Sequence, residues 1–277
     1  MPIGIFDSSL AGLAVLQKLQ SKLPRQAFMY LYDAEGSPYE HKEPDEIFDI
    51  SCGAVQCLFD RGCELVIIVC NNASAVALHK MQIEWLPDGK RRVLGVFVPV
   101  IEHLTQRDWG DNTPPTHTGL KNVAVFATQS TINSGAFQRE LKFRARDVEV
   151  FDQICNGLVM AIENKDWKLS ESLVEQYVGQ LLLRLPSPQA AVLACTHFTI
   201  VEKMFQAALP GETQLINQPD LVVGATIDYL ERHPRFVENG PPVYLTTGDV
   251  KNMRSRTKQY PGLEITWNKS ELGNTNA

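Results

Sequence analysis

Short apolar segments alternate along this chain with segments whose apolar residues recur every three to four positions. Up to residue 100, the short segments predict strands at 3–6, 27–33, 65–70 and 93–100, and the periodic segments predict helices at 12–23, 44–62 and 72–83. The run "LVIIVC" at 65–70 is apolar throughout, which is typical of a parallel strand covered on both faces. This alternation predicts an α/β protein with parallel sheets and crossover helices.

The same pattern returns after a polar segment at 105–121 that contains Pro114 and Pro115. We expect a domain junction or an exposed loop in that segment. Beyond it, strands are predicted at 123–128, 148–152, 190–195, 213–217 and 243–249, and helices at 133–143, 154–164, 167–184, 198–209 and 219–232. At 277 residues, the chain has room for one large domain or two medium ones.

Composition narrows the classes of function. Hydrophobic residues make up 44% and charged residues 21%, which are ordinary globular values. A net charge of −6 without a basic stripe argues against nucleic acid as the main partner. The longest apolar runs are too short to span a membrane, and no basic and apolar leader precedes the first strand. We therefore expect a cytoplasmic protein with no membrane partner and with its six cysteines reduced.

Two cysteines stand in matching places, each closing a short apolar strand and each followed by polar residues. Cys70 runs into Asn71 and Asn72, and Cys195 runs into Thr196 and His197. The carboxyl ends of parallel strands open onto the ligand crevice of an α/β sheet. Taken singly, each thiol is more typical of a buried core residue. A helix N-terminus directly after the strand would instead favour a thiolate and an anionic ligand.

Other polar residues follow the first two strands and are candidates for the same crevice. Asp7 and Ser8 either cap a helix or reach the site, and Asp33 precedes Pro38 and Tyr39. His197 is either a structural histidine or a proton carrier that tunes Cys195. The chain has no glycine-rich nucleotide motif, and its cysteine spacing fits no zinc pattern. Nothing in the sequence therefore requires a nucleotide, a metal or pyridoxal phosphate.

Six segments in order resemble the glutamate racemase family of the cofactor-independent aspartate/glutamate racemase superfamily. They are "IGIFDSSLAGLAVL", "YLYDAEGSPYE", "VIIVCNNASA", "VFATQSTINSGAF", "LACTHF" and "YLTTGD", and they run from residue 3 to residue 249. The resemblance implies two doubly wound, pseudo-symmetric α/β domains with the active site in the crevice between them. We place the first domain at 1–98 plus 209–277 and the second at 99–208.

The resemblance also implies roles for individual residues. Cys70 and Cys195 match the two acid/base groups, one of which removes the α-proton while the other protonates the opposite face. The other matches to catalytic positions are Asp7, Asp33, Glu163 and His197. The residues expected to contact substrate are Ser8, Pro38, Tyr39, Glu40, Asn71, Asn72, Thr131, Thr196 and His197. Ser9, Glu40 and Asn72 depart from the family's usual Gly, Gly and Thr, so racemase chemistry is better supported than glutamate as the substrate.

The expected function is the cofactor-independent interconversion of L- and D-glutamate, which would supply D-glutamate for peptidoglycan. The expected partner is a small amino acid, and a homodimer rests on resemblance alone. Three alternatives remain open at this stage. One is a racemase of aspartate or a related compound, another is an amino-acid-binding homologue with impaired catalysis, and the third is a hydrolase with a cysteine nucleophile.

Overall fold

The computed structural model describes residues 1–86, 89–108, 111, 113–257 and 263–273. The chain divides into two compact units, Met1–Val96 with Val222–Ala277 and Phe97–Leu221. Compared with the boundary expected at 208/209, the return to the first unit comes later in the chain. The reason is that strand β8 (Gln214–Ile216) pairs with β7 (Ala190–Ala194) in the sheet of the second unit.

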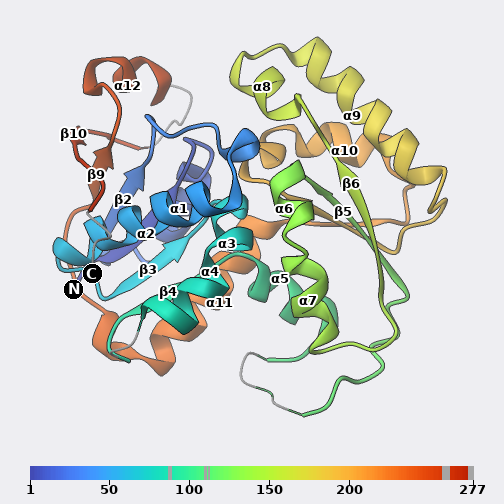
Figure 1. The fold of residues 1–277 in the computed structure, drawn as a ribbon, viewed down its shortest axis with the longest axis horizontal. Coiled ribbons are helices and arrows are strands. Elements are labelled where there is room, and N and C mark those ends of the chain that lie inside the picture. Colours follow the sequence, from blue (N-terminus) through green and yellow to red (C-terminus); the bar gives the residue numbers. More distant parts are fainter. Residues whose placement is uncertain (87–88, 109–110, 112, 258–262, 274–277) are drawn as a thin grey trace. The chain divides into compact units, whose positions relative to one another are not determined.

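The first unit is built on a six-stranded sheet in the order β10-β9-β2-β1-β3-β4, and every pair of neighbours is parallel (Figure 1). Its strands are β1 (Ile3–Asp7), β2 (Phe28–Tyr32), β3 (Leu65–Ile68), β4 (Arg92–Leu94), β9 (Val243–Thr246) and β10 (Trp267–Lys269). Its helices are α1 (Leu13–Lys22), α2 (Pro44–Asp60), α3 (Asn71–Val76), α4 (Leu78–Lys80) and α12 (Val250–Arg256). A π-helical turn at Met81–Trp85 follows α4, and 3-10 turns lie at Tyr39–His41 and Pro234–Phe236. Helix α11 (Gln218–Arg232) carries the chain across the division at Leu221.

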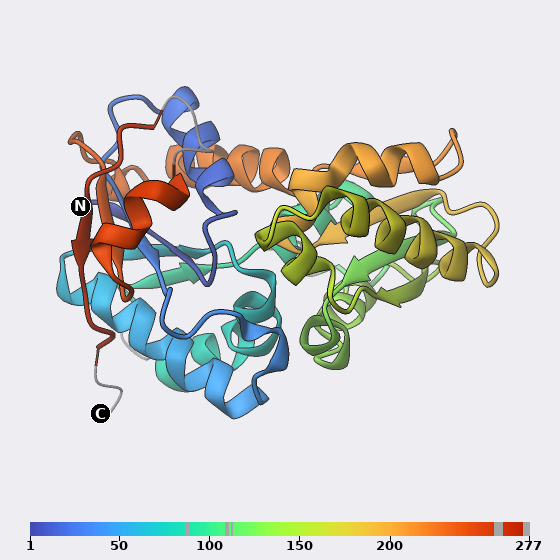
Figure 2. The same cartoon turned by 90° about the horizontal axis from the view of Figure 1, so that it is seen from above.

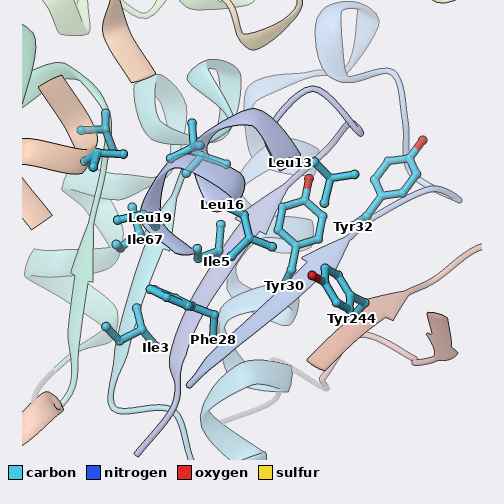
Figure 3. Close-up of a cluster of buried hydrophobic side chains, with 14 of the residues drawn as sticks. Ile3, Ile5, Leu13, Leu16, Leu19, Phe28, Tyr30, Tyr32, Ile67 and Tyr244 are labelled. Carbon is cyan, nitrogen blue, oxygen red and sulfur yellow. The ribbon is translucent and has the colours of Figure 1, made fainter. Parts of the chain in front are cut away.

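Alternate residues of the central strands pack into two separate hydrophobic clusters of the first unit, one on each face of the sheet. Ile3 and Ile5 of β1 join the cluster that holds Leu16 of α1, whereas Phe6 joins the cluster that holds Ile47 of α2. Figure 2 shows α1 and α2 on opposite sides of this sheet. Figure 3 shows part of the cluster that contains Ile3 and Ile5. The residues labelled there are Ile3, Ile5, Leu13, Leu16, Leu19, Phe28, Tyr30, Tyr32, Ile67 and Tyr244. A sheet covered on both faces explains why its strands read as continuous apolar runs.

The second unit has a four-stranded parallel sheet in the order β6-β5-β7-β8. Strand β5 is Asn122–Ala127 and β6 is Glu149–Ile154. The helices are α5 (Phe97–Thr105), α6 (Gln129–Asn133), α7 (Ala136–Lys142), α8 (Leu158–Glu163), α9 (Trp167–Leu182) and α10 (Glu202–Ala208), with a 3-10 helix at Thr196–Val201. In chain order the four strands follow the same 2-1-3-4 arrangement as β2-β1-β3-β4 of the first sheet. The expected α/β class with two related parallel sheets is thus confirmed.

The prediction of one strand over 93–100 is wrong. Strand β4 ends at Leu94, and Phe97 begins helix α5. The apolar run hid a helical spacing, because Phe97, Val100, Ile101 and Leu104 form the buried face of α5. Pro99 is tolerated in the first turn of that helix, where its missing N–H costs no intrahelical bond.

The segment at 105–121 lies within the second unit, between α5 and β5, so it is a loop and not the junction between domains. Residues 109–110 and 112 of it fall outside the described residues. Arg107 donates to Asp111 and Thr113 within this loop. It also donates to the Arg144 carbonyl, which links the loop to the segment after α7. The strand predicted last, at 243–249, is followed by a further strand, β10. None of the described helices is long and apolar enough to cross a membrane.

Candidate active site

Cys70 and Cys195 occupy equivalent places in the two units. Each follows the third strand of its 2-1-3-4 arrangement, and each is the residue directly before a helix, α3 in one case and the 3-10 helix Thr196–Val201 in the other. The strand registers agree, because Phe6 is paired with Ile68 and Phe126 with Leu193, two residues before each cysteine. Both thiols are buried, with 4% and 7% of the residue exposed.

The Cys70 thiol lies among polar groups of the first unit. Its Sγ is 3.0 Å from the Ser8 Oγ, and the Ala73 N–H donates to it at 3.5 Å. Burial, followed by the negative charge of Asp7, raises the pKa of Cys70 to about 12, against the opposing effect of the bonds to Ala73 and Ser8. The bond from the first turn of the helix lowers the pKa of Cys70, as expected, but it does not decide the net direction of the shift. One N–H bond is outweighed by the loss of solvent.

Asp7 is fully buried at the carboxyl end of β1. Its Oδ2 accepts hydrogen bonds from the Gly12 N–H at 2.7 Å and from the Ser9 hydroxyl at 2.9 Å. A side chain at position 12 would bring its Cβ to 2.4 Å from the same oxygen, so this approach requires glycine. Two donors on one carboxylate oxygen stabilise the ionised form.

Asp33 is joined to the site through Tyr39. The Tyr39 hydroxyl donates to Asp33 Oδ2 at 2.7 Å, and the Thr247 hydroxyl donates to Asp33 Oδ1 at 2.7 Å. Burial is the largest cause that raises the pKa of Tyr39 well above its usual value. Electrostatic interactions with Asp33, Cys70 and Asp7 raise it in the same direction. The phenol therefore stays neutral, and its electrostatic interaction with Cys70 and Asp7 places it near them. Thr247 had no role assigned from the sequence, because only the pairing of β9 with β2 brings it to Asp33.

The remaining predicted residues of the first unit follow the carboxyl ends of its strands. Asn71 and Asn72 begin α3 and are both buried. Pro38 follows a cis peptide bond directly before Tyr39. Glu40 is buried, and its carboxylate is 3.2 Å from the Nε2 of exposed His41. Asn71 and Asn72 thus follow Cys70 in α3, whereas Pro38 and Glu40 flank Tyr39.

The second unit surrounds Cys195 with a three-residue chain of contacts. Glu163 Oε1, at the end of α8, is 2.7 Å from His197 Nε2, and His197 Nδ1 is 3.8 Å from Cys195 Sγ. Burial alone would lower the pKa of His197, but the bonds to Cys195 and Glu163 and the charges of both outweigh it and raise the pKa to about 10. At neutral pH His197 is thus an imidazolium ion. A cation beside a cysteine favours negative charge on its sulfur.

Thr131 and Thr196 are buried in the second unit, Thr131 in the helix after β5 and Thr196 in the 3-10 helix after Cys195. The hydroxyl of Thr128 donates to that of Thr131 at 3.3 Å. Cys155, which had no role predicted from the sequence, stands after β6 as Asp33 stands after β2. Its N–H donates to the Ala127 carbonyl as that of Asp33 does to the Asp7 carbonyl. Burial and the charge at Cys195 raise the pKa of the Cys155 thiol well above its usual value.

Among the residues that the structure describes, no group of three or more His, Cys, Asp or Glu side chains is placed to hold a metal ion. The groups beside the two thiols can support proton transfer, since Cys70 has the Asp7 carboxylate near it and Cys195 has the His197 imidazolium.

No family model matches the chain. The glutamate racemase of Roseobacter denitrificans is 50% identical over 260 residues, which cover 94% of this chain and 96% of that protein. The glutamate racemase of Jannaschia sp. is 49% identical over 267 residues, covering 96% and 98%. Among solved structures, glutamate racemase isoform RacE1 of Bacillus anthracis superposes with a TM-score of 0.84 at 22% identity, over 98% of this chain and 97% of that one.

The two parallel sheets of matching order, with one cysteine after the third strand of each, have the fold of a racemase. The identity to curated relatives over nearly the whole length is far above what a shared fold alone requires. The chain belongs to the glutamate racemase family.

Proposed function

We propose that this protein interconverts L- and D-glutamate without a cofactor, and that Cys70 and Cys195 exchange the α-proton from opposite faces of the substrate. The observation that carries the proposal is the equivalent placement of the two thiols, each after the third strand of a sheet of the same order. Family membership supports glutamate as the substrate. The groups around Cys70 in the first unit are here called the Cys70 half-site, and those around Cys195 in the second unit the Cys195 half-site.

The charges of the half-sites assign different starting roles to the two sulfurs. Cys70 starts as the thiol, because burial and Asp7 raise its pKa to about 12. Cys195 is assigned the role of base, because its sulfur lies 3.8 Å from the His197 imidazolium, which Glu163 holds in place. The resting enzyme then has the one acid and the one base that a two-base mechanism requires. The enantiomer whose α-hydrogen faces Cys195 is the one that the resting enzyme can deprotonate.

In the forward half-reaction, the Cys195 sulfur forms a bond to the α-proton while the Cα–H electron pair stays on the substrate as a carbanion. The Cys70 S–H bond then breaks, and its proton joins Cα on the opposite face. The products are the other enantiomer, a Cys195 thiol and a Cys70 thiolate. The reverse reaction, or proton exchange between the thiols and solvent, restores the starting state.

The carbanion must be stabilised by fixed donors around the substrate carboxylate. The candidates are the buried side chains and N–H groups of Asn71, Asn72, Thr131 and Thr196, which lie directly after strands that carry the two cysteines or neighbour them. Ser8, Pro38, Tyr39 and Glu40 complete the lining of the Cys70 half-site. Asp33 acts through Tyr39, whose hydroxyl it fixes.

The product D-glutamate would serve peptidoglycan synthesis in the cytoplasm, and the enzyme would act as a homodimer on a small amino acid alone. The most direct test of the activity offers L- and D-glutamate and L- and D-aspartate to the purified chain in buffer that contains a chelator and no pyridoxal phosphate. Loss of circular dichroism from both glutamate enantiomers, with aspartate turned over at least about tenfold more slowly, is the expected result.

Faster loss from aspartate would instead favour the alternative substrate. Calorimetric binding of glutamate without any loss of optical activity would identify a binding protein that has lost turnover. In D₂O, one solvent deuteron should enter Cα during each conversion, because each product hydrogen comes from a cysteine that exchanges with solvent. Product that retains the substrate hydrogen would contradict the use of two bases.

A further inference from the structure

Ser9 stands one residue beyond the predicted site residues Asp7 and Ser8, at a position where the family pattern has glycine. Ser9 is buried, with only 1% of the residue exposed, and its side chain is hydrogen-bonded. The Ser9 hydroxyl donates to Asp7 Oδ2 at 2.9 Å and accepts from the Ala11 N–H at 3.1 Å. The Tyr30 hydroxyl donates to the Ser9 carbonyl at 2.8 Å, which fixes the backbone on its other side.

These bonds determine where the Ser9 proton points. An N–H can only donate, so the Ala11 amide occupies a lone pair of the Ser9 oxygen. The hydroxyl proton is then available to Asp7, whose Oδ2 also receives the Gly12 N–H at 2.7 Å. The second donor to this carboxylate is therefore supplied by a side chain that a glycine at position 9 would lack.

We infer that Ser9 is a positioning residue for the Cys70 half-site: its hydroxyl fixes the orientation of the Asp7 carboxylate and offsets part of its negative charge beside the Cys70 thiol. The inference rests on the proposed function in that Cys70 is taken as one of the two proton-transfer groups. It adds a residue that acts through Asp7 and does not itself touch the substrate. Because Ser9 acts on one half-site only, its loss should slow proton transfer at Cys70 and leave transfer at Cys195 unchanged.

Two variants test the hydroxyl in different ways. Ser9→Ala places a methyl group where the hydroxyl donated, so Asp7 loses the bond and water cannot replace it. Ser9→Gly leaves a gap in which a water molecule can donate instead. Ser21→Ala is the matched control, because Ser21 is an exposed serine of the same unit that bonds only the Lys18 carbonyl in the described contacts.

The first measurement is the primary deuterium isotope effect on kcat/KM for each enantiomer labelled at Cα. With Ser9→Ala we expect kcat to fall roughly tenfold, as for loss of one hydrogen bond to a charged group. The isotope effect should rise for the enantiomer that Cys70 deprotonates and fall for the other one. Ser9→Gly should lie between Ser9→Ala and the wild type, and Ser21→Ala should match the wild type.

The second measurement requires no substrate, so its outcome stands even if the chain does not racemise glutamate. Alkylation of Cys70 by iodoacetamide, followed by peptide mass spectrometry, reports how readily the thiolate forms. With the Ser9 donor gone, the Asp7 charge is less compensated, and alkylation of Cys70 should slow about threefold while that of Cys195 stays constant. Equal isotope effects and equal alkylation rates in Ser9→Ala, Ser21→Ala and the wild type would overturn the inference, because Ser9 would then only shape the local turn. A symmetrical fall in both isotope effects would overturn the inference as well.

Discussion

The Cys70 and Cys195 half-sites share a position in the fold and differ in the sign of the charge that each cysteine meets. Cys70 lies beside the Asp7 carboxylate, and its pKa is raised to about 12. Cys195 lies beside His197, whose own pKa is raised to about 10 and which is therefore cationic at neutral pH. Two thiols in the same structural place can thus be prepared as acid and base by their neighbours alone.

The difference originates at the ends of the neighbouring strands. In the first unit, the central strand ends in Asp7 and the strand beside it is followed by Asp33. The matching places in the second unit hold Ala127 and Cys155, neither of which carries a charge at neutral pH. The second unit obtains its charges from helices instead, with Glu163 at the end of α8 and His197 in the 3-10 helix. Helix-borne groups can therefore replace strand-end groups at an equivalent site.

The largest effect is expected when one of the two sulfur atoms is removed at a time. Cys70→Ser and Cys195→Ser should each lower kcat for glutamate racemisation by at least about 10³-fold, because a serine hydroxyl replaces an essential proton-transfer group. Steady-state circular dichroism in both directions measures the loss. Cys57→Ser is the matched control, because that buried cysteine already bonds a serine, Ser270, at 3.3 Å and lies in helix α2. Substantial racemisation by either single variant would mean that one thiol is sufficient.

A second experiment compares the two thiols directly in the free protein. At pH 8 we expect iodoacetamide to modify Cys195 at least about tenfold faster than Cys70, since only the thiolate reacts and burial keeps Cys70 protonated. Asp7→Asn should narrow the gap by speeding alkylation of Cys70, because it removes the charge that disfavours the thiolate. Time-resolved peptide mass spectrometry gives both rates in one sample. Faster alkylation of Cys70 than of Cys195 would reverse the assigned roles.

The sequence predicted the positions of these groups better than their charges. Apolar strands that end in Cys70 and Cys195 were visible, and so was His197 two residues further on. Glu163 was found only by resemblance, because the fold alone brings it across 34 positions of sequence to His197. The raised pKa of Cys70 was missed for a physical reason. The helix N-terminus that lowers a thiol pKa can be predicted from local sequence, whereas the burial that outweighs it depends on tertiary packing.

Helix α5 was missed for a similar reason. The run that contains Phe97 satisfies both a strand pattern and a helix pattern, and only the packing of its apolar face selects helix α5. Thr247 bonds Asp33 because β9 pairs with β2, a neighbourhood that no local pattern encodes. Long-range pairing of this kind lies beyond what periodicity can predict.

The smallest expected effect is the pH dependence of thermal stability that His197 contributes in the Cys195 half-site. The pKa of His197 is raised from 6.5 to about 10 on folding, so its contribution to stability is fully present below pH 6.5 and is lost as the pH rises through about 10. Removal of the imidazole should remove that dependence. Between pH 6.5 and pH 10, the Tm of the wild type should fall by a few degrees more than that of His197→Asn, on the order of 2–4 °C per kcal/mol for a chain of this size.

The Cys70 thiol also destabilises the folded state above pH 9, but it does so equally in both proteins, so its contribution cancels from the difference in Tm. His79→Asn, an exposed histidine in α4, should follow the wild type. A His197→Asn variant that loses as much Tm as the wild type would show that the contacts of His197 with Glu163 and Cys195 are not formed in solution.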